Sequence, residues 1–177
     1  KTLFPYTTLF RSPMSESSEP TLESLRAEGA HHYDPARFHY LEVLARRLPG
    51  QHAAVQQVLA RGADFTLVEG AGGWRVPLAG RETLADLVVA LELPVILVVG
   101  VRLGCINHAV LTAEAIAHDG LHLAGWVANI VDPQTSRLEE NLATLAERLP
   151  APCLGRVPRL ALATPAAVAA HLSLSAL

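Results

Sequence analysis

The sequence predicts an α/β fold with a doubly wound, mostly parallel sheet. From Asp64 onward, short apolar runs alternate with longer amphipathic segments, an order typical of strand–helix–strand units. The run Val95–Val99 is continuous and rich in β-branched residues, as expected for a parallel strand covered on both faces. Turn and capping residues separate these segments at the spacing that such units need.

Composition excludes several classes of protein. The 177 residues are 50% hydrophobic and 18% charged, with a net charge of −3, which indicates one globular domain. Aromatic residues make up 5% and no basic stripe occurs, so we expect no nucleic-acid partner. No apolar run reaches the roughly 18 residues of a membrane span, and we expect no membrane association. Cys105 and Cys153 lack zinc-site spacing; we expect buried thiols and a cytoplasmic location.

We expect three parts along the chain. Residues 1–12 resemble the translation of a sequencing-adapter oligonucleotide, so we expect them to be non-native and to contribute nothing to the fold. Residues 13–63 predict a helical N-terminal part. Residues 64–177 predict an α/β nucleotide- and substrate-binding domain.

In the helical part, the segment Thr21–Glu28 predicts a short helix. Asp34-Pro35 has the pattern of an N-cap followed by proline, and an apolar stripe predicts a helix from there to Pro49-Gly50. The stripe consists of Phe38, Leu41, Leu44 and Leu48. A further helix is expected over Gln51–Arg61.

In the α/β part, strands and helices alternate. Strands are expected at Phe65–Val68, Val95–Val99, Leu123–Val127 and Cys153–Val157. Capping-box spacing at Thr83–Asp86 and Ser136–Glu139 predicts two helices, the second ending at Leu149. Gly100–Asn107 is expected as a loop before a helix that ends near His118. Thr164-Pro165 predicts a last helix to about His171.

A carboxylate followed by glycines marks the end of the first of these strands. Glu69 follows the run Phe65–Val68, and three glycines stand among the next four residues. In open α/β sheets, ligands bind beyond the carboxyl ends of the strands. A glutamate there, beside backbone that glycine lets a ligand approach, suits Mg²⁺ and phosphate oxygens. The alternative is a plain glycine turn with a solvated Glu69.

Two asparagines follow the next two strands, and we expect all three loops at one edge of the sheet. Asn107 stands near a helix start, where free N–H groups and the helix dipole suit a carboxylate; as an alternative it is an ordinary N-cap. The amide of Asn129 offers a donor and an acceptor, which fits the edge of a nucleobase. Its alternative is an ordinary loop residue.

Three long segments closely resemble the dethiobiotin synthetase family. They are Val68–Trp74 (Val-Glu-Gly-Ala-Gly-Gly-Trp), Leu93–His108 with its Leu-Gly-Cys-Ile-Asn-His end, and Leu123–Asn129 (Leu-Ala-Gly-Trp-Val-Ala-Asn). The resemblance is strong from about Asp64 to Leu160, looser to Leu177 and weak before Asp64. It implies a sheet of the P-loop NTPase type.

The resemblance also implies a reaction and a set of site residues. The family closes the ureido ring of dethiobiotin from 7,8-diaminononanoate, CO2 and ATP with Mg²⁺, as a homodimer. Glu69 is then a Mg²⁺ ligand. The implied ATP-binding residues are Glu69, Gly70, Ala71, Gly72, Asn129, Pro158, Arg159 and Leu160. The implied contacts to the diaminononanoate carboxylate, across the dimer interface, are Gly104, Cys105, Ile106 and Asn107.

The chain departs from the family pattern at its N-terminal side. The family opens with a strand and a P-loop carrying a Lys-Thr pair, and it uses a second lysine near the substrate. Here no G-x-x-x-x-G-K-S/T motif occurs, and the sole lysine is Lys1. We therefore assign no catalytic residue, and we expect a fragment that lacks the first strand and the P-loop. We expect it to bind nucleotide weakly, to be inactive alone and to be poorly soluble.

Two alternatives stay open from the sequence. One is a related P-loop amido-ligase of corrinoid biosynthesis, which shares the sheet and the carboxylate loop. The other is a non-catalytic dimerisation module of the same fold, which should carry a basic or amphipathic surface helix.

Overall fold

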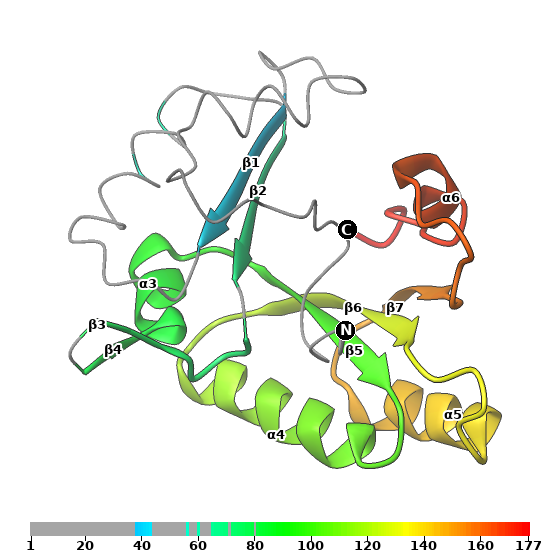
Figure 1. Ribbon diagram of the computed structural model, residues 1–177. Coiled ribbons are helices and arrows are strands. Elements are labelled where there is room, and N and C mark those ends of the chain that lie inside the picture. The colour runs from blue at the N-terminus through cyan, green and yellow to red at the C-terminus, as the bar shows by residue number, and fades with distance from the viewer. Residues whose placement is uncertain (1–37, 44–55, 57–59, 61–64, 71, 80) are drawn as a thin grey trace.

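The computed structural model describes residues 38–43, 56, 60, 65–70, 72–79 and 81–177. Two parallel sheets and one short hairpin make up its strands (Figure 1). The expected segments at 1–12 and Thr21–Glu28 lie outside the described residues. Of the helix expected over Gln51–Arg61, Gln56 is helical, and its carbonyl accepts a hydrogen bond from Ala60 N–H at 2.9 Å.

The main sheet is parallel and has the order β5-β6-β7. Its strands are β5 (Val95–Val101), β6 (Leu123–Ile130) and β7 (Cys153–Val157). Each occurs where the apolar runs predict a strand, and each is joined to the next by a helix. These helices are α4 (Cys105–His118) and α5 (Leu138–Arg148). The α/β class with parallel strands is confirmed.

Both faces of the main sheet are covered. Side chains from β5 and β6 alternate between two cores, as the period of two in a strand requires. Leu97, Val99, Trp126 and Ala128 pack with α4 and α5. Val127, Leu154 and Val157 pack on the other face with Val168 of α6 (Pro165–Ala169). Figure 1 shows α4 and α5 along one face of this sheet and α6 on the opposite face.

A second, two-stranded parallel sheet pairs β1 (Phe38–Val43) with β2 (Phe65–Gly70). The helix predicted from the stripe beginning at Phe38 is therefore wrong over these six residues. Phe, Tyr and Val are strand-forming residues, and a parallel partner in β2 satisfies the backbone of this segment. In the described part of the chain, β2 pairs with β1 and not with β5.

A hairpin and a short helix follow β2. The hairpin, which the sequence reasoning missed, consists of β3 (Pro77–Ala79) and β4 (Glu82–Thr83). Helix α3 (Leu84–Leu91) begins where predicted. Its capping box is confirmed: Thr83 Oγ1 accepts a hydrogen bond from Asp86 N–H, and the Asp86 carboxylate accepts one from Thr83 N–H at 2.6 Å. Leu84 and Leu87 pack with Leu78 and Val68.

Other predicted boundaries need correction. The loop expected over Gly100–Asn107 is shorter, because β5 continues to Val101 and α4 begins at Cys105. The second capping box does not form: Arg137, in a left-handed conformation (φ 57°), precedes α5 and separates Ser136 from its first turn. The last helix ends at Ala169 rather than His171. Both cysteines are free, but Cys153 is exposed at the start of β7, contrary to expectation.

Candidate functional site

The carboxyl ends of β5, β6 and β7 meet at one edge of the main sheet. Asn129 of β6 is in register with Gly100 of β5 on one side and with Val157 of β7 on the other. Because all three strands run parallel, the segments that follow them leave from the same edge. This is the position at which open α/β sheets bind ligands.

Asn129 and the segment after β7 are brought together at this edge. Asn129 is partly buried within β6, so it is a strand residue and not part of the following loop. Pro158, Arg159 and Leu160 follow Val157 directly. The Arg159 guanidinium donates a hydrogen bond to the carbonyl of Val131 at 3.3 Å, and so joins the segment after β7 to the segment after β6.

The second predicted cluster lies at the start of α4. Gly104 is the N-cap in a left-handed conformation (φ 89°), and no side chain caps the first turn. Cys105 is buried, Ile106 packs against the main core and Asn107 is exposed. Asn107 is therefore the third residue of α4, and its interpretation as an N-cap is wrong. An N-terminal turn without a side-chain cap suits an anionic group.

The glycine-rich loop follows β2, with Glu69 as the next-to-last residue of that strand. Glu69 is partly buried. Glycine is required at position 70 by packing, because an added Cβ would collide with the Leu84 side chain. Glycine is favoured at position 72 by the backbone conformation, since φ there is +93°. Ala71 lies outside the described residues.

The expectation that all three loops share one sheet edge holds in part. The segments after β5 and β6 leave from the main sheet, whereas β2 belongs to the sheet formed with β1 among the described residues. The structure thus joins Asn129 with Pro158–Leu160 and places Gly104–Asn107 beyond the same edge. Glu69 stands in the second sheet.

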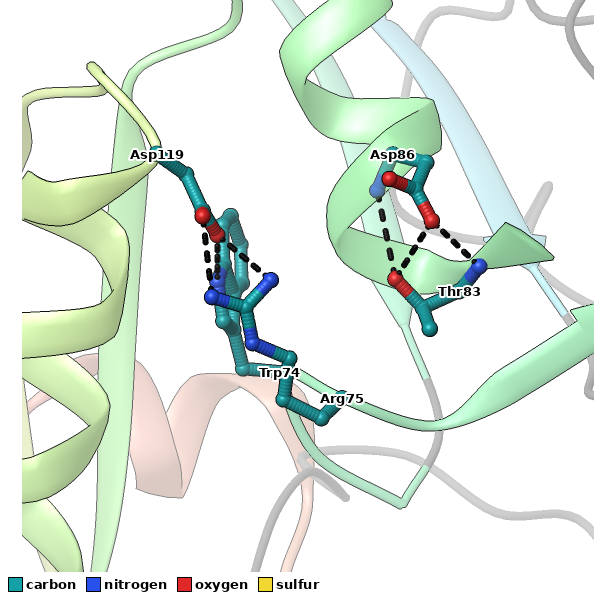
Figure 2. A network of polar contacts seen from close by, with 5 residues as sticks. All are labelled: Trp74, Arg75, Thr83, Asp86 and Asp119. Carbon is teal, nitrogen blue, oxygen red and sulfur yellow. Dashed lines mark hydrogen bonds and ion pairs between the residues drawn. The ribbon is translucent and has the colours of Figure 1, made fainter. Parts of the chain in front are cut away.

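A polar cluster at the end of the glycine-rich loop was missed by the sequence reasoning. The Trp74 indole N–H donates to Asp119 Oδ2 at 2.7 Å, and Arg75 Nη2 donates to Asp119 Oδ1 at 2.8 Å (Figure 2). The Arg75 hydrogen bond holds the pKa of the Asp119 carboxyl below its usual value, and the Trp74 bond acts in the same direction. Asp119 lies 45 residues beyond Trp74, so no local pattern could reveal this contact.

The residues at Glu69 fit one hard cation rather than a protein-built metal cage. In the part of the chain that the structure describes, no three His, Cys, Asp or Glu side chains gather as metal ligands. Mg²⁺ is commonly held by one or two carboxylates together with phosphate oxygens and waters. A single, partly buried carboxylate at a strand end is compatible with that mode of binding.

The described helices include none that is long and apolar enough to cross a membrane.

Residues 19–167 match the protein family described as AAA domain. The chain is also similar to proteins named ATP-dependent dethiobiotin synthetase BioD. It is 78% identical to that of Pseudomonas aeruginosa over 134 residues, 76% of this chain and 58% of that protein. It is 67% identical to that of Cellvibrio japonicus over 117 residues, 66% of this chain and 51% of that protein.

A third relative covers more of both chains. The protein of the same name from Chromohalobacter salexigens is 49% identical over 189 residues, with 90% of this chain and 80% of that protein covered. The chain spans 58% of the length of the Pseudomonas aeruginosa relative. The alternative of a corrinoid amido-ligase is not favoured by these relatives. The chain belongs to the ATP-dependent dethiobiotin synthetase family.

Proposed function

We propose that this chain belongs to an enzyme that closes the ureido ring of dethiobiotin from 7,8-diaminononanoate, CO2 and ATP. The observation that carries the proposal is the 78% identity over 134 residues to an ATP-dependent dethiobiotin synthetase. The stretch that resembles the family most, Asp64 to Leu160, supplies the strand ends described above. A cytoplasmic location stays a prediction from cysteine usage.

The proposed reaction has three steps. One amine of the substrate adds to CO2 and loses a proton, which gives a carbamate. A carbamate oxygen attacks the γ-phosphorus of ATP and expels ADP, forming a mixed carbamic–phosphoric anhydride. The second amine attacks the carbamoyl carbon and expels inorganic phosphate, which closes the ring. The main demand on the protein is to offset negative charge on the γ-phosphate and carbamate oxygens.

We propose that Glu69 holds Mg²⁺ and that Gly70, Ala71 and Gly72 line the phosphate side. When bound, the ion offsets charge on the phosphate oxygens. The carboxylate supplies a hard oxygen ligand, and the left-handed Gly72 allows backbone there to run without a side chain.

We propose that Asn129, Pro158, Arg159 and Leu160 contact the adenine. The register of β6 with β7 and the Arg159 hydrogen bond to the Val131 carbonyl support this role, because they hold the two segments together. The Asn129 amide offers one donor and one acceptor to a base edge.

We propose that Gly104, Cys105, Ile106 and Asn107 bind the substrate carboxylate across a homodimer interface. The first turn of α4 has no side-chain cap, and this supports binding of an anionic group there. Leu103 is 94% exposed and Leu111 on α4 is 55% exposed, so apolar side chains stand on the surface near this turn. A second copy of the chain would cover them.

The test measures dethiobiotin formed from diaminononanoate, radiolabelled bicarbonate and MgATP. We expect no turnover from the 177-residue chain, because the lysines that the family pattern requires are not in it beyond Lys1. A fusion carries the part of the Pseudomonas aeruginosa relative that precedes the matched segment. We expect ATP-dependent product from this fusion and none from its Glu69→Ala variant. A folded fusion that forms no product, or a Glu69→Ala variant as active as its parent, would contradict the proposal.

A further inference from the structure

Asp119, the residue that follows α4, accepts hydrogen bonds from two consecutive residues at the end of the glycine-rich loop. Its Oδ2 accepts the Trp74 indole N–H at 2.7 Å, and its two oxygens face the two terminal nitrogens of Arg75, both at 2.8 Å. Figure 2 shows Trp74 and Arg75 both directed at this one carboxylate. We call Trp74, Arg75 and Asp119 the Asp119 clamp. A two-point guanidinium–carboxylate contact fixes orientation as well as distance.

The clamp joins the loop to the body of the protein. The Asp119 side chain is 14% exposed, and Trp74 packs against the main core. The carbonyls that flank Arg75 are also used: Trp74 C=O accepts Ala85 N–H at 3.1 Å, and Val76 C=O accepts Leu84 N–H at 2.9 Å. The segment Trp74–Val76 is therefore held by α4 on one side and by the start of α3 on the other.

Between Glu69 and the clamp, the chain passes through residues of high backbone freedom. Gly72 and Gly73 both have positive φ, +93° and +119°, and a side chain at Gly73 would meet open space. Glycine pairs do not hold a fixed path by themselves. Gly72 and Gly73 therefore depend on the clamp that follows them for a fixed path.

The clamp also lies at the far end of the helix that carries Gly104–Asn107. Helix α4 has 14 residues, which is about 21 Å at 1.5 Å per residue. Asp119 is too far from that end to contact a substrate bound there. Its effect must act through the loop.

We propose that Asp119 is a positioning residue: through Trp74 and Arg75 it holds Gly72 and Gly73 on the phosphate side of the Mg²⁺ site that Glu69, fixed in β2, provides for a bound nucleotide. This inference rests on the proposed function. It assigns to Asp119 a role distinct from that of a ligand, because its two carboxylate oxygens are occupied by Trp74 and Arg75.

The first measurement needs no ligand. Amide hydrogen exchange of Leu84 and Ala85 reports whether the segment Trp74–Val76 stays in place, since both amides donate to it. We expect Asp119→Asn to speed this exchange about tenfold, as loss of a charged hydrogen-bond partner implies. The matched control is Glu140→Gln, which removes an exposed carboxylate paired with Arg137 at 3.0 Å. It should leave the exchange unchanged. Unchanged exchange in Asp119→Asn would overturn the inference that Asp119 holds the segment Trp74–Val76 in place.

The second measurement is equilibrium dialysis of the 177-residue chain with radiolabelled ATP, with and without Mg²⁺. We expect Asp119→Asn to weaken the Mg²⁺-dependent uptake about tenfold and to leave Mg²⁺-independent uptake unchanged. Faster exchange with normal Mg²⁺-dependent uptake would overturn the positioning role. If the unsubstituted chain shows no Mg²⁺-dependent uptake, the proposed Mg²⁺ role of Glu69 fails, and this is seen before any substitution; the ring closure itself is tested separately by the fusion.

A further variant covers the case in which Asp119→Asn does not fold. Arg75→Ala removes the guanidinium from a side chain that is 53% exposed, so folding is not at stake. It should shift exchange and Mg²⁺-dependent uptake in the same directions as Asp119→Asn. No shift in either would contradict the inference.

Discussion

Asn129 of β6 lies in register with Gly100 of β5, so the amide at the sheet edge stands beside a residue that has no side chain. On its other side it is in register with Val157, after which the chain turns into Pro158 and Arg159. This arrangement leaves one polar side chain between two apolar neighbours at the position where open α/β sheets bind ligands.

The first prediction concerns that amide. Asn129→Asp keeps the shape of the side chain but replaces its donor with an acceptor, so we expect ATP affinity to fall about tenfold, the cost of a mismatched hydrogen bond. Equilibrium dialysis measures the change. Gln134→Glu adds the same charge at an exposed position after β6 and is the control. An equal loss in both variants would show that charge alone, and not the Asn129 donor, matters.

The second prediction concerns the cap of α3. Thr83→Ala removes the oxygen that accepts Asp86 N–H, and should lower the free energy of unfolding by about 1 kcal/mol. Thr144→Ala, within α5, removes a hydroxyl that donates a hydrogen bond to the Glu140 carbonyl. This change should leave the free energy of unfolding unchanged or raise it slightly, because alanine favours helix interiors. Urea unfolding of both variants checks this. A larger loss in Thr144→Ala would be inconsistent with the capping box.

The third prediction concerns the close contact between β7 and the C-terminal segment. A Cβ on Gly155 would collide with the backbone oxygen of His171, whereas the atoms nearest to a Cβ on Gly125 belong to the side chain of Leu154. Backbone gives way less than a side chain, so Gly155→Ala should lower the free energy of unfolding by about 1–3 kcal/mol more than Gly125→Ala does. It should also weaken the Ser173 N–H bond to the Leu154 carbonyl. Unfolding curves and amide exchange at Ser173 test this, and equal costs would contradict it.

The fourth prediction concerns pH. The folded-state pKa of Asp119 is lowered, first by the Arg75 hydrogen bond. The carboxylate therefore contributes stability above its ordinary pKa of 3.8, and this contribution is lost as pH falls through the lower folded value. The difference in unfolding free energy between the unsubstituted chain and Asp119→Asn should be largest at neutral pH and should shrink below about pH 4. A difference that stays constant to pH 2.5 would exclude this origin.

Sequence patterns predicted the main sheet because each of its strands is an apolar run with a local signal at its ends. They failed at Phe38–Val43, where Phe38 and Leu41 satisfy a helical spacing while the run also suits a strand. The choice depends on pairing with β2, which local spacing does not encode. The capping box predicted at Ser136 does not form, because Arg137, in a left-handed conformation, stands between Ser136 and the first turn of α5. The Asp119 clamp depends on a contact across 45 residues, which one sequence cannot reveal.

The most direct test of the account is Mg²⁺-dependent ATP binding by Glu69→Gln, measured by equilibrium dialysis beside the unsubstituted chain. The control Glu82→Gln neutralises an exposed glutamate in β4. We expect the unsubstituted chain and the control to bind ATP weakly and more tightly with Mg²⁺, and Glu69→Gln to lose the Mg²⁺ effect. An equal Mg²⁺ effect in Glu69→Gln would contradict the proposed role of Glu69 as the Mg²⁺ ligand.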